Sequence, residues 1–316
     1  MVKQSPKLSV ILPVHNAGSF LIEAIESILH QTFTDFELII INDGSTDDSG
    51  NIIGEFQDPR IKAITQENKG LRATLNIGLA AASGAYIARM DQDDISLPDR
   101  FEKQVAFLDA HPDYVLVGAT YGYIDEQSNI TGSFPALLDD EDIKRELFTK
   151  SPFGHGTIMA RTESLKGGGY TYSNEAVHME DYELWIRFSV AGKYANLPEI
   201  LYLWRRSSTN TTSKHGRLQL HKGYELQIKT FNHFDLPSLV QWLGWKNARK
   251  YRNTSIEIGG KRVDVRRHDA HCSLYLNLAW LFFHRGNFGL SIRAIFYAIL
   301  ISPVYIMKFG WKYGKP

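Results

Sequence analysis

Three carboxylates lie within four residues in the segment RMDQDD (residues 89–94), which follows an apolar run at residues 85–88. Like charges this close repel one another and are costly to hold together unless a cation lies among them. Mg²⁺ or Mn²⁺ would suit them, since both take oxygen ligands and are usually held by one or two carboxylates together with substrate phosphates. A second interpretation is a solvated acidic loop before a helix that begins near Pro98. The segment alone leaves the metal site and the solvated loop both open. If it is a metal site, a nucleotide diphosphate is its natural ligand.

The segments around these carboxylates alternate between two hydrophobic patterns. Continuous apolar runs, each ended by a polar loop, predict buried β-strands. They cover residues 8–14, 37–41, 61–65 and 85–90. Between them, apolar residues recur at the spacing of an amphipathic helix. These stretches cover residues 21–29, 52–56 and 71–82. The alternation predicts an α/β fold with a mostly parallel central sheet flanked by helices.

The polar loops that follow the predicted strands should lie close together. In a parallel α/β sheet, ligands bind outside the carboxyl ends of the strands. We therefore expect one edge of the sheet to gather Asn16, Asp43, Lys69 and Asp91. The sequence contains neither GxGxxG nor GxxxxGK[ST], which argues against a dinucleotide-binding Rossmann unit and a P-loop NTPase. Phosphate would have to be bound by a metal ion and side chains.

Further residues that could do chemistry come later in the chain. The glycines of residues 153–159 (FGHGTIM) allow the backbone to approach a ligand closely, and three glycines at 167–169 predict a mobile loop. Residues 179–188 (MEDYELWIRF) predict a helix with a buried stripe. Glu180 and Asp181 would lie at its N-terminal end, where the helix dipole favours a charged, proton-accepting carboxylate.

The composition limits the compartment and the partners. A chain of 316 residues can form one large domain with an appendage. The formal net charge is zero, yet residues 201–316 hold 19 Lys and Arg against 5 Asp and Glu, which favours a polyanion or an anionic membrane surface as partner. The single cysteine, Cys272, rules out an internal disulfide and suits a reducing compartment. The N-terminus shows no secretory signal pattern.

Five motifs, taken in order, resemble the inverting nucleotide-sugar glycosyltransferases of family 2, of the bacterial surface-polysaccharide type, which have the GT-A fold. They are PVHNAGSFLIEAIESILHQTF, FELIIINDGSTDDS, ENKGLRATLNIGL, GAYIARMDQDD and HMEDYELWIRF. The resemblance covers roughly residues 7–205. Each motif is weak by itself, but five with consistent order and spacing are specific.

The resemblance implies roles for individual residues. A nucleotide-sugar site would contain Pro13, His15, Asn16, Asp43, Lys69, Arg72, Asp91, Gln92 and Arg205. Within it, Asp43 would receive a uracil-type base. Asp91 and Asp93 match the D-x-D positions that hold Mn²⁺ or Mg²⁺. His215 is a further candidate metal ligand, in a segment whose spacing departs from the usual Arg-x-His form.

Asp181 matches the general base of the family. It would deprotonate an acceptor hydroxyl, which attacks C1 of the sugar from the face opposite the departing diphosphate and inverts the anomeric centre. His155, Glu180 and Trp185 are expected on the acceptor side. The expected partners are a UDP-sugar donor and a glycan or lipid-linked acceptor, and no nucleic acid. Two rival functions are a sugar-phosphate nucleotidyltransferase, which needs no acceptor base, and a non-catalytic protein that binds glycan or nucleotide-sugar.

We expect a catalytic domain at residues 1–215 and a helical, basic C-terminal region at residues 216–316. The apolar run at residues 294–307 is too short to span a bilayer comfortably. Basic and aromatic residues flank it and predict an interfacial segment docked on an anionic leaflet. The enzyme would then lie in the cytoplasm, at the cytoplasmic face of the inner membrane. The alternative is hydrophobic helices packed on the catalytic core or on another subunit of a homo-oligomer.

Overall fold

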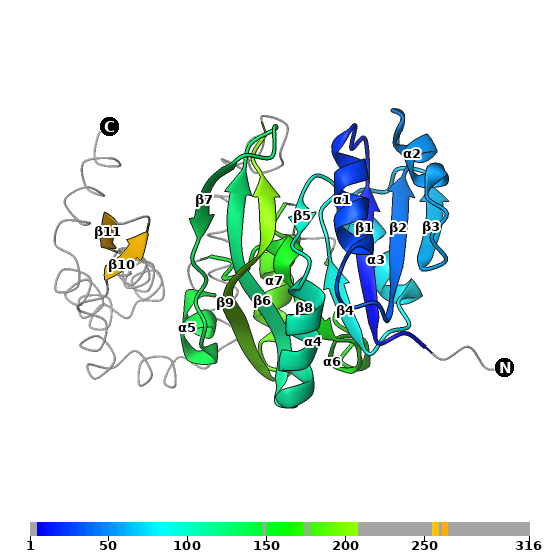
Figure 1. The fold of residues 1–316 in the computed structure, drawn as a ribbon. Coiled ribbons are helices and arrows are strands. Elements are labelled where there is room, and N and C mark those ends of the chain that lie inside the picture. Colours follow the sequence, from blue (N-terminus) through cyan, green and yellow to red (C-terminus); the bar gives the residue numbers. More distant parts are fainter. Residues whose placement is uncertain are drawn as a thin grey trace, which may run out of the picture. The chain divides into compact units, whose positions relative to one another are not determined.

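The computed structural model describes residues 5–147, 150–173, 176, 178–207, 255–258 and 261–264, without the side chains of Arg145 and of the last two ranges. The chain divides into two compact units, Met1–Leu147 with Ser151–Lys222 and Phe148–Lys150 with Gly223–Pro316. The first unit has an α/β fold built around a central sheet (Figure 1).

Strands and helices alternate in the first half of this unit, as the sequence predicts. The elements are β1 (Leu8–Val14), α1 (Phe20–Leu29), β2 (Phe36–Asp43), α2 (Ser49–Glu55), β3 (Ile61–Gln66), α3 (Leu71–Ala81) and β4 (Tyr86–Arg89). The chain continues through β5 (Ile95–Ser96), α4 (Arg100–Ala110), β6 (Tyr114–Ile124), β7 (Ile130–Phe134), α5 (Asp140–Glu146), η1 (His155–Thr157), β8 (Met159–Arg161), α6 (Thr162–Gly167), α7 (Glu180–Phe188) and β9 (Lys193–Arg205).

The sheet has the strand order β3-β2-β1-β4-β8-β6-β9-β5, with β7 paired to β6. Strands β3, β2, β1 and β4 run parallel, and so do β6 and β9. The predicted class, an α/β fold with a mostly parallel sheet, is therefore confirmed. Strand β8 is antiparallel to both of its neighbours, β4 and β6. Because β8 pairs with β4 in this direction, the glycine-containing segment before β8 reaches the residues that follow β4.

Helices cover both faces of the sheet (Figure 1). On one face, alternate residues of β1 and β2 form a single buried cluster with residues of α1, α2 and α4. On the other face α3 packs closely, because a Cβ added at Gly78 would lie 2.5 Å from Ile11 Cγ2. Every residue of β1 and β2 is buried, as expected for parallel strands covered on both sides. These two layers fix the loops at the carboxyl ends of the strands.

Apart from Lys150, the described part of the second unit is a two-stranded antiparallel hairpin. Strands β10 (Ser255–Ile258) and β11 (Lys261–Asp264) pair with Ile258 opposite Lys261. They are an exception to the helical character predicted for residues 216–316. The sequence SIEIGGKRVD carries the signal, since Gly-Gly between alternating residues is typical of a hairpin. The rest of that region, with the predicted interfacial segment, lies outside the described residues.

Candidate active site

The loop after β1 is tied to the segment after β4 by a reciprocal pair of hydrogen bonds. The backbone N–H of His15 donates to Gln92 Oε1 at 2.7 Å, and Gln92 Nε2 donates to the carbonyl oxygen of His15 at 3.2 Å. The His15 side chain is exposed, whereas Pro13 is buried in β1. The structure therefore brings His15 and Gln92 together, and it leaves Pro13 as part of the strand below them.

Asn16 joins the loop after β1 to the loop after β2. Its φ is 50°, in the left-handed region that asparagine tolerates better than most residues. Its Oδ1 accepts a hydrogen bond from the backbone N–H of Thr46 at 2.8 Å, and its own N–H donates to Ser45 Oγ at 3.1 Å. These bonds bring the carboxyl ends of β1 and β2 together at the edge where the sequence predicts a ligand site.

Asp43, the residue expected to receive the base, is buried at the end of β2. Its Oδ1 accepts hydrogen bonds from Gln66 Nε2 at 2.7 Å and from the N–H of Lys69 at 2.8 Å. Its Oδ2 accepts one from the N–H of Gly70 at 2.9 Å. Burial by itself would raise the pKa of this carboxyl, but the hydrogen bonds outweigh it and hold the pKa below its ordinary value. Asp43 therefore organises the loop 66–70, and any contact with a base would add to these bonds.

Lys69 and Arg72 lie on either side of the start of α3. Lys69 contributes its backbone N–H to Asp43, and its side chain is exposed. Gly70 has a φ of 81°, so it supplies the left-handed turn between the loop and the helix. Arg72 is half-buried, and its positive charge partly offsets the burial that raises the pKa of Glu180. Arg72 therefore acts on Glu180 at the start of α7.

The acidic turn, residues 91–94, follows the end of β4. Arg89, the last residue of that strand, is 4% exposed and forms an ion pair with Asp91. Burial and then the negative charge of Asp91 raise the pKa of Asp93 to about 6. Repulsion between these two carboxylates is a condition that a divalent cation would relieve, which agrees with the metal interpretation.

Asp94 anchors the acidic turn to β9. It is 1% exposed, its Oδ2 accepts a hydrogen bond from the Tyr202 hydroxyl at 2.7 Å, and its Oδ1 accepts one from the N–H of Arg205 at 2.8 Å. The N–H of Asp91 donates to the same Tyr202 hydroxyl at 3.2 Å. Burial, followed by the charges of Asp91 and Asp93, raises the pKa of Asp94 well above its ordinary value. Of the three carboxylates, Asp94 is thus structural, while the other two are only half-buried.

Gly156 makes room for the Tyr202 hydroxyl, so Gly156→Ala is expected to destabilise the site. A Cβ at this position would lie 2.0 Å from that hydroxyl oxygen, which would have to leave its partners in the acidic turn. We expect urea denaturation to show a loss of about 1–3 kcal/mol in the free energy of unfolding. Gly167→Ala is the control, because nothing lies within 4 Å of its added Cβ. Equal losses in the two variants would contradict the steric explanation.

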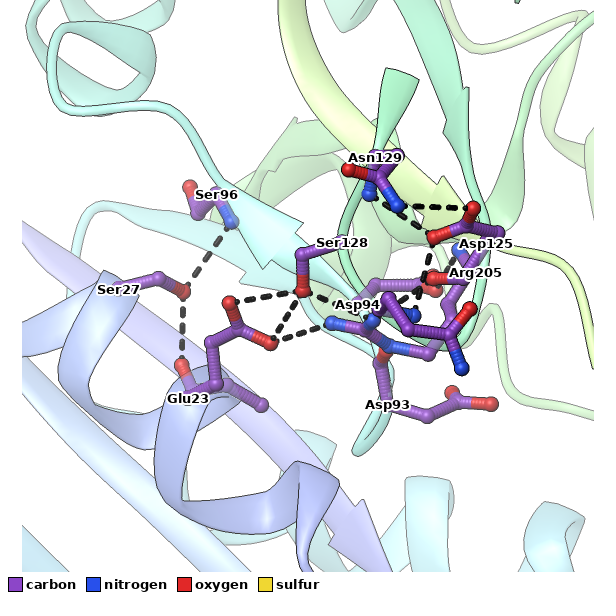
Figure 2. A network of polar contacts seen from close by, with 11 residues as sticks. Glu23, Ser27, Asp93, Asp94, Ser96, Asp125, Ser128, Asn129 and Arg205 are labelled. Atoms are coloured by element: carbon purple, nitrogen blue, oxygen red, sulfur yellow. Dashed lines mark hydrogen bonds and ion pairs between the residues drawn. The ribbon is translucent and has the colours of Figure 1, made fainter. Parts of the chain in front are cut away.

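The structure corrects the prediction for Arg205. In place of an accessible contact for diphosphate, its side chain is 1% exposed, and its guanidinium group lies within a polar network (Figure 2). The guanidinium partners include the carbonyl oxygen of Asp93 at 2.8 Å, the carbonyl oxygen of Asp125 at 2.9 Å, Ser128 Oγ at 3.0 Å and the carboxylate of Glu23. A buried guanidinium must satisfy its N–H donors within the protein, which explains these contacts.

Glu180 and Asp181 are the first two residues of α7, as the sequence predicts. Asp181 is half-buried and accepts a hydrogen bond from Ser151 Oγ at 3.3 Å. Burial raises the pKa of both carboxyls, and the charge of Asp181 helps to raise that of Glu180 to about 7. A carboxylate with a raised pKa accepts a proton more readily than an ordinary aspartate. The position and electrostatics of Asp181 therefore suit a general base.

His155 and Trp185 differ in their burial, although both were expected on the acceptor side. His155 is half-buried, and its Nε2 shares a hydrogen bond with the Tyr172 hydroxyl at 2.9 Å. Trp185 is 1% exposed and packs edge-on against Phe153 and His155, with ring centroids 6.0 Å apart in both pairs. The expectation that Trp185 lies on the acceptor side is therefore corrected, because the buried stripe of α7 turns its indole into the core.

Arg89 is the residue that the sequence analysis missed. Arg89 pairs with Asp91, and its positive charge partly offsets the burial that raises the pKa of Glu180 and of Asp181. Its Nε is buried and has no hydrogen-bond partner among the described residues. A signal was present, since an arginine at the end of a buried apolar strand is costly unless it is paired. Arg89 connects the acidic turn electrostatically to α7.

The residues of the acidic turn fit a divalent ion that is completed by substrate. Across the described ranges, no group of three or more His, Cys, Asp and Glu side chains is arranged to hold a metal. Asp91 and Asp93 would supply one or two carboxylates, and substrate phosphates and water would supply the other oxygens, as is usual for Mg²⁺. The repulsion between these carboxylates supports that arrangement. His215 lies outside the described residues.

Comparison with known proteins identifies the family. The family described as Glycosyl transferase family 2 matches residues 9–168, about half of the chain. The putative glycosyltransferase EpsE of Bacillus subtilis (strain 168) is 40% identical over 213 residues, which cover 66% of this chain and 76% of that protein. The chain belongs to glycosyl transferase family 2. The amylovoran biosynthesis glycosyltransferase AmsE of Erwinia amylovora is 32% identical over 215 residues, 66% of this chain and 79% of AmsE. Membership makes the protein a glycosyltransferase and sets aside both rival functions.

Solved structures share the fold of this family 2 glycosyltransferase. S. aureus TarS 1-349 in complex with UDP-GlcNAc has a TM-score of 0.62 at 18% identity, over 92% of this chain and 90% of that chain. The mannosyltransferase PcManGT from Pyrobaculum calidifontis, in complex with GDP-Man and Mn²⁺, has a TM-score of 0.54 at 14% identity, over 97% and 88%. At these identities the likeness shows the fold alone, and it confirms the predicted GT-A type.

The family 2 match covers part of the candidate site. It includes the loops after β1 to β4, with Asp43, Asp91 and Asp93, and ends at residue 168, before α7. The assignment of Asp181 therefore depends on the local structure of α7. In the part of the glycosyltransferase that the structure describes, no helix has both the length and the apolar character needed to cross a membrane.

Proposed function

We propose that this glycosyltransferase moves a sugar from a nucleotide diphosphate sugar, specifically a UDP-sugar, to a hydroxyl of a glycan or lipid-linked acceptor with inversion of the anomeric centre. One observation carries the proposal. The buried guanidinium of Arg89 pairs with Asp91, and its charge favours the ionised forms of Glu180 and Asp181, which supports one site that contains both sets of carboxylates. The uridine nucleotide in the TarS complex supports the choice of donor.

The donor would lie across the carboxyl ends of β1, β2 and β4. His15, Asn16 and Gln92 would frame the nucleotide, since their hydrogen bonds hold these loops together. Asp43 and the loop 66–70 would face the base. When bound, a Mn²⁺ or Mg²⁺ ion held by Asp91 and Asp93 would supply positive charge against the leaving diphosphate.

Asp181 accepts the proton of the acceptor hydroxyl in the chemical step. As the hydroxyl oxygen forms its bond to C1 of the sugar, the bond from C1 to the diphosphate oxygen breaks, and its electron pair leaves with the nucleotide diphosphate. Attack from the opposite face inverts C1. The hydroxyl of Ser151 donates to Asp181 and helps to orient it, and Arg89 favours its charged form.

The class of acceptor is inferred from the charge of the C-terminal residues and from the name of a relative. The basic surplus of residues 201–316 supports a lipid-linked acceptor at the cytoplasmic face of the inner membrane. The name of AmsE, a protein of amylovoran biosynthesis, supports a polysaccharide product. Membrane docking and a homo-oligomer stay predictions, because the C-terminal segments on which they depend lie outside the described residues.

A donor screen tests the proposed function. The full chain is incubated with Mn²⁺, an acceptor extract and several UDP-sugars, with GDP-sugars and dTDP-sugars for comparison, and products are followed by mass spectrometry. We expect UDP release together with the mass of one added sugar. Release of pyrophosphate, or no release from any donor, would contradict the proposal.

The rate of transfer is expected to fall on acidification through the raised pKa values of the α7 carboxylates. An acid with a raised pKa is protonated at a higher pH, so the base is lost at a higher pH than an ordinary aspartate would be, because burial raises the pKa of Asp181. The pKa of Glu180 is raised to about 7 by burial and then by the charge of Asp181. Glu180→Gln removes the carboxyl whose pKa is about 7 and should therefore move the fall in kcat/KM to lower pH.

A matched variant on the same helix controls this pH profile. Glu183 pairs with Arg187 at 2.6 Å, so Glu183→Gln should leave the profile in place. An unshifted profile in Glu180→Gln, or a rate that increases on acidification, would show that these carboxylates do not limit the reaction.

A further inference from the structure

Arg205, the last residue of β9, donates two hydrogen bonds to the acidic turn. The backbone N–H of Arg205 donates to Asp94 Oδ1 at 2.8 Å, and its side-chain Nε donates to the carbonyl oxygen of Asp93 at 2.8 Å. These partners lie more than a hundred residues away in the sequence. Arg205 thereby holds the backbone carbonyl of Asp93 and the side chain of Asp94, the residue that follows Asp93.

The guanidinium of Arg205 is itself held from two other segments (Figure 2). Its Nη1 donates to the carbonyl oxygen of Asp125 at 2.9 Å and to Ser128 Oγ at 3.0 Å, both in the β6–β7 turn. Its Nη2 pairs with Glu23 of α1, whose side chain is 44% exposed. A planar guanidinium whose N–H donors are bound by acceptors on several sides has little freedom to rotate.

The β6–β7 turn is shaped to present the hydroxyl of Ser128. Ser128 has a φ of 63°, a left-handed conformation that costs a non-glycine residue roughly 1–2 kcal/mol. Its Oγ donates to Glu23 at 3.1 Å and accepts from Arg205 at 3.0 Å. Asp125 holds the turn by accepting from the N–H groups of Gln127 and Asn129, both at 2.9 Å. Strain of this kind persists where the surroundings over-determine a position.

We propose that Arg205, with Glu23 and Ser128, is a positioning residue that aims the Asp93 carboxylate at the donor diphosphate. In Figure 2 this carboxylate points away from the network, while the carbonyl oxygen of the same residue is bound within it. The inference rests on the proposed function, since it assigns Asp93 to a metal ion shared with the donor phosphates. Arg205 itself touches neither the ion nor the donor.

Calorimetric titration of the full chain with UDP, in Mn²⁺ and separately in EDTA, tests this role. Arg205→Lys keeps the positive charge but loses the planar set of donors. We expect UDP binding in Mn²⁺ to weaken by about 10-fold or more, the usual effect of removing a group that supports a metal ligand. Binding in EDTA should stay within about twofold of wild type, because the loops around the base are unchanged.

Ser128→Gly separates positioning from stability. Glycine adopts a φ of 63° without strain, so thermal unfolding should not shift to lower temperature. The hydroxyl that bridges Glu23 and Arg205 is nevertheless lost, and Mn²⁺-dependent binding should weaken in the same direction as in Arg205→Lys. A purely structural role for the network would not predict weaker binding in a variant of unchanged stability.

Arg161→Lys is the matched control. Its guanidinium donates to the carbonyl oxygens of Leu108, His111 and Tyr114. All three lie outside the acidic turn. This variant should lose stability and keep wild-type binding of UDP in Mn²⁺. Weaker binding equal to that of Arg205→Lys would mean a general loss of structure and would overturn the inference.

The failures of the two hypotheses are distinguishable. If wild-type protein binds UDP equally in Mn²⁺ and EDTA, the proposed metal-assisted function fails, and the inference fails with it. If wild type shows the metal dependence and Ser128→Gly binds like wild type, the positioning role alone is overturned. Ser128→Gly decides in the same way if Arg205→Lys does not fold.

Discussion

Replacing Asp181 by asparagine is expected to lower kcat by roughly 10³-fold, within the range that general-base catalysis contributes. Asparagine has nearly the same shape and can keep the contact with Ser151, which lies 3.3 Å from the carboxylate. It cannot accept a proton at neutral pH, so the acceptor hydroxyl would have to attack without a base. UDP binding in Mn²⁺ should change by no more than about twofold, because the lost interaction is made only in the transition state. Steady-state UDP release and calorimetry measure the two quantities.

Glu183→Gln is the control for this experiment. It changes a carboxylate on the same helix, one that pairs with Arg187 on the surface of α7. We expect a kcat close to that of wild type. Turnover of Asp181→Asn near the wild-type rate would remove Asp181 as the base, and equal losses in both variants would indicate damage to the helix.

Asp93→Asn is expected to weaken UDP binding in Mn²⁺ by roughly 10²-fold, since a metal ion contributes several kcal/mol where negative charge gathers. An amide keeps the size of the side chain but loses the charge that a hard cation needs. Removing the charge also relieves repulsion from Asp91, which helps to raise the pKa of Asp93 to about 6. The thermal stability of the variant without metal should therefore be no lower than that of wild type.

Asp109→Asn is the matched control for the metal experiment. Asp109 lies in α4 and pairs with Lys7 at 2.8 Å. Its replacement should leave Mn²⁺-dependent UDP binding unchanged, whatever its effect on stability. Binding in Mn²⁺ that is preserved in Asp93→Asn would show that the acidic turn does not hold the metal.

Local patterns in the sequence were sufficient for the fold and for the outline of the site. The continuous apolar runs of β1 and β2 predict strands buried on both faces, and the structure has them. Parallel strands then required the loops after them to meet, as the contacts of His15 with Gln92 and of Asn16 with Thr46 show. Helix periodicity likewise placed Glu180 and Asp181 at the start of α7.

Side-chain roles that depend on distant partners were not accessible in this way. The sequence predicted an accessible role for Arg205, but the acidic turn, the β6–β7 turn and α1 meet around its side chain and bury it. The sequence placed Trp185 on a helical stripe but did not show which way the stripe faces. In the structure Trp185 packs against Phe153 and His155. The sequence marked Arg89 only as the end of a strand. In the folded protein its charge also acts on two carboxylates of α7.

The sequence by itself determined the alternation of strands and helices, the edge of the sheet that carries polar loops, and the family motifs around Asp91, Asp93 and Asp181. These follow from spacing within one element, which is a local property. The tertiary structure decided which of the three carboxylates in the acidic turn is structural. Asp94 is bound by Tyr202 and by the backbone of Arg205, residues 108 and 111 positions away. No local pattern encodes such a contact, because burial and hydrogen bonding assign a carboxylate its role only after the chain has folded.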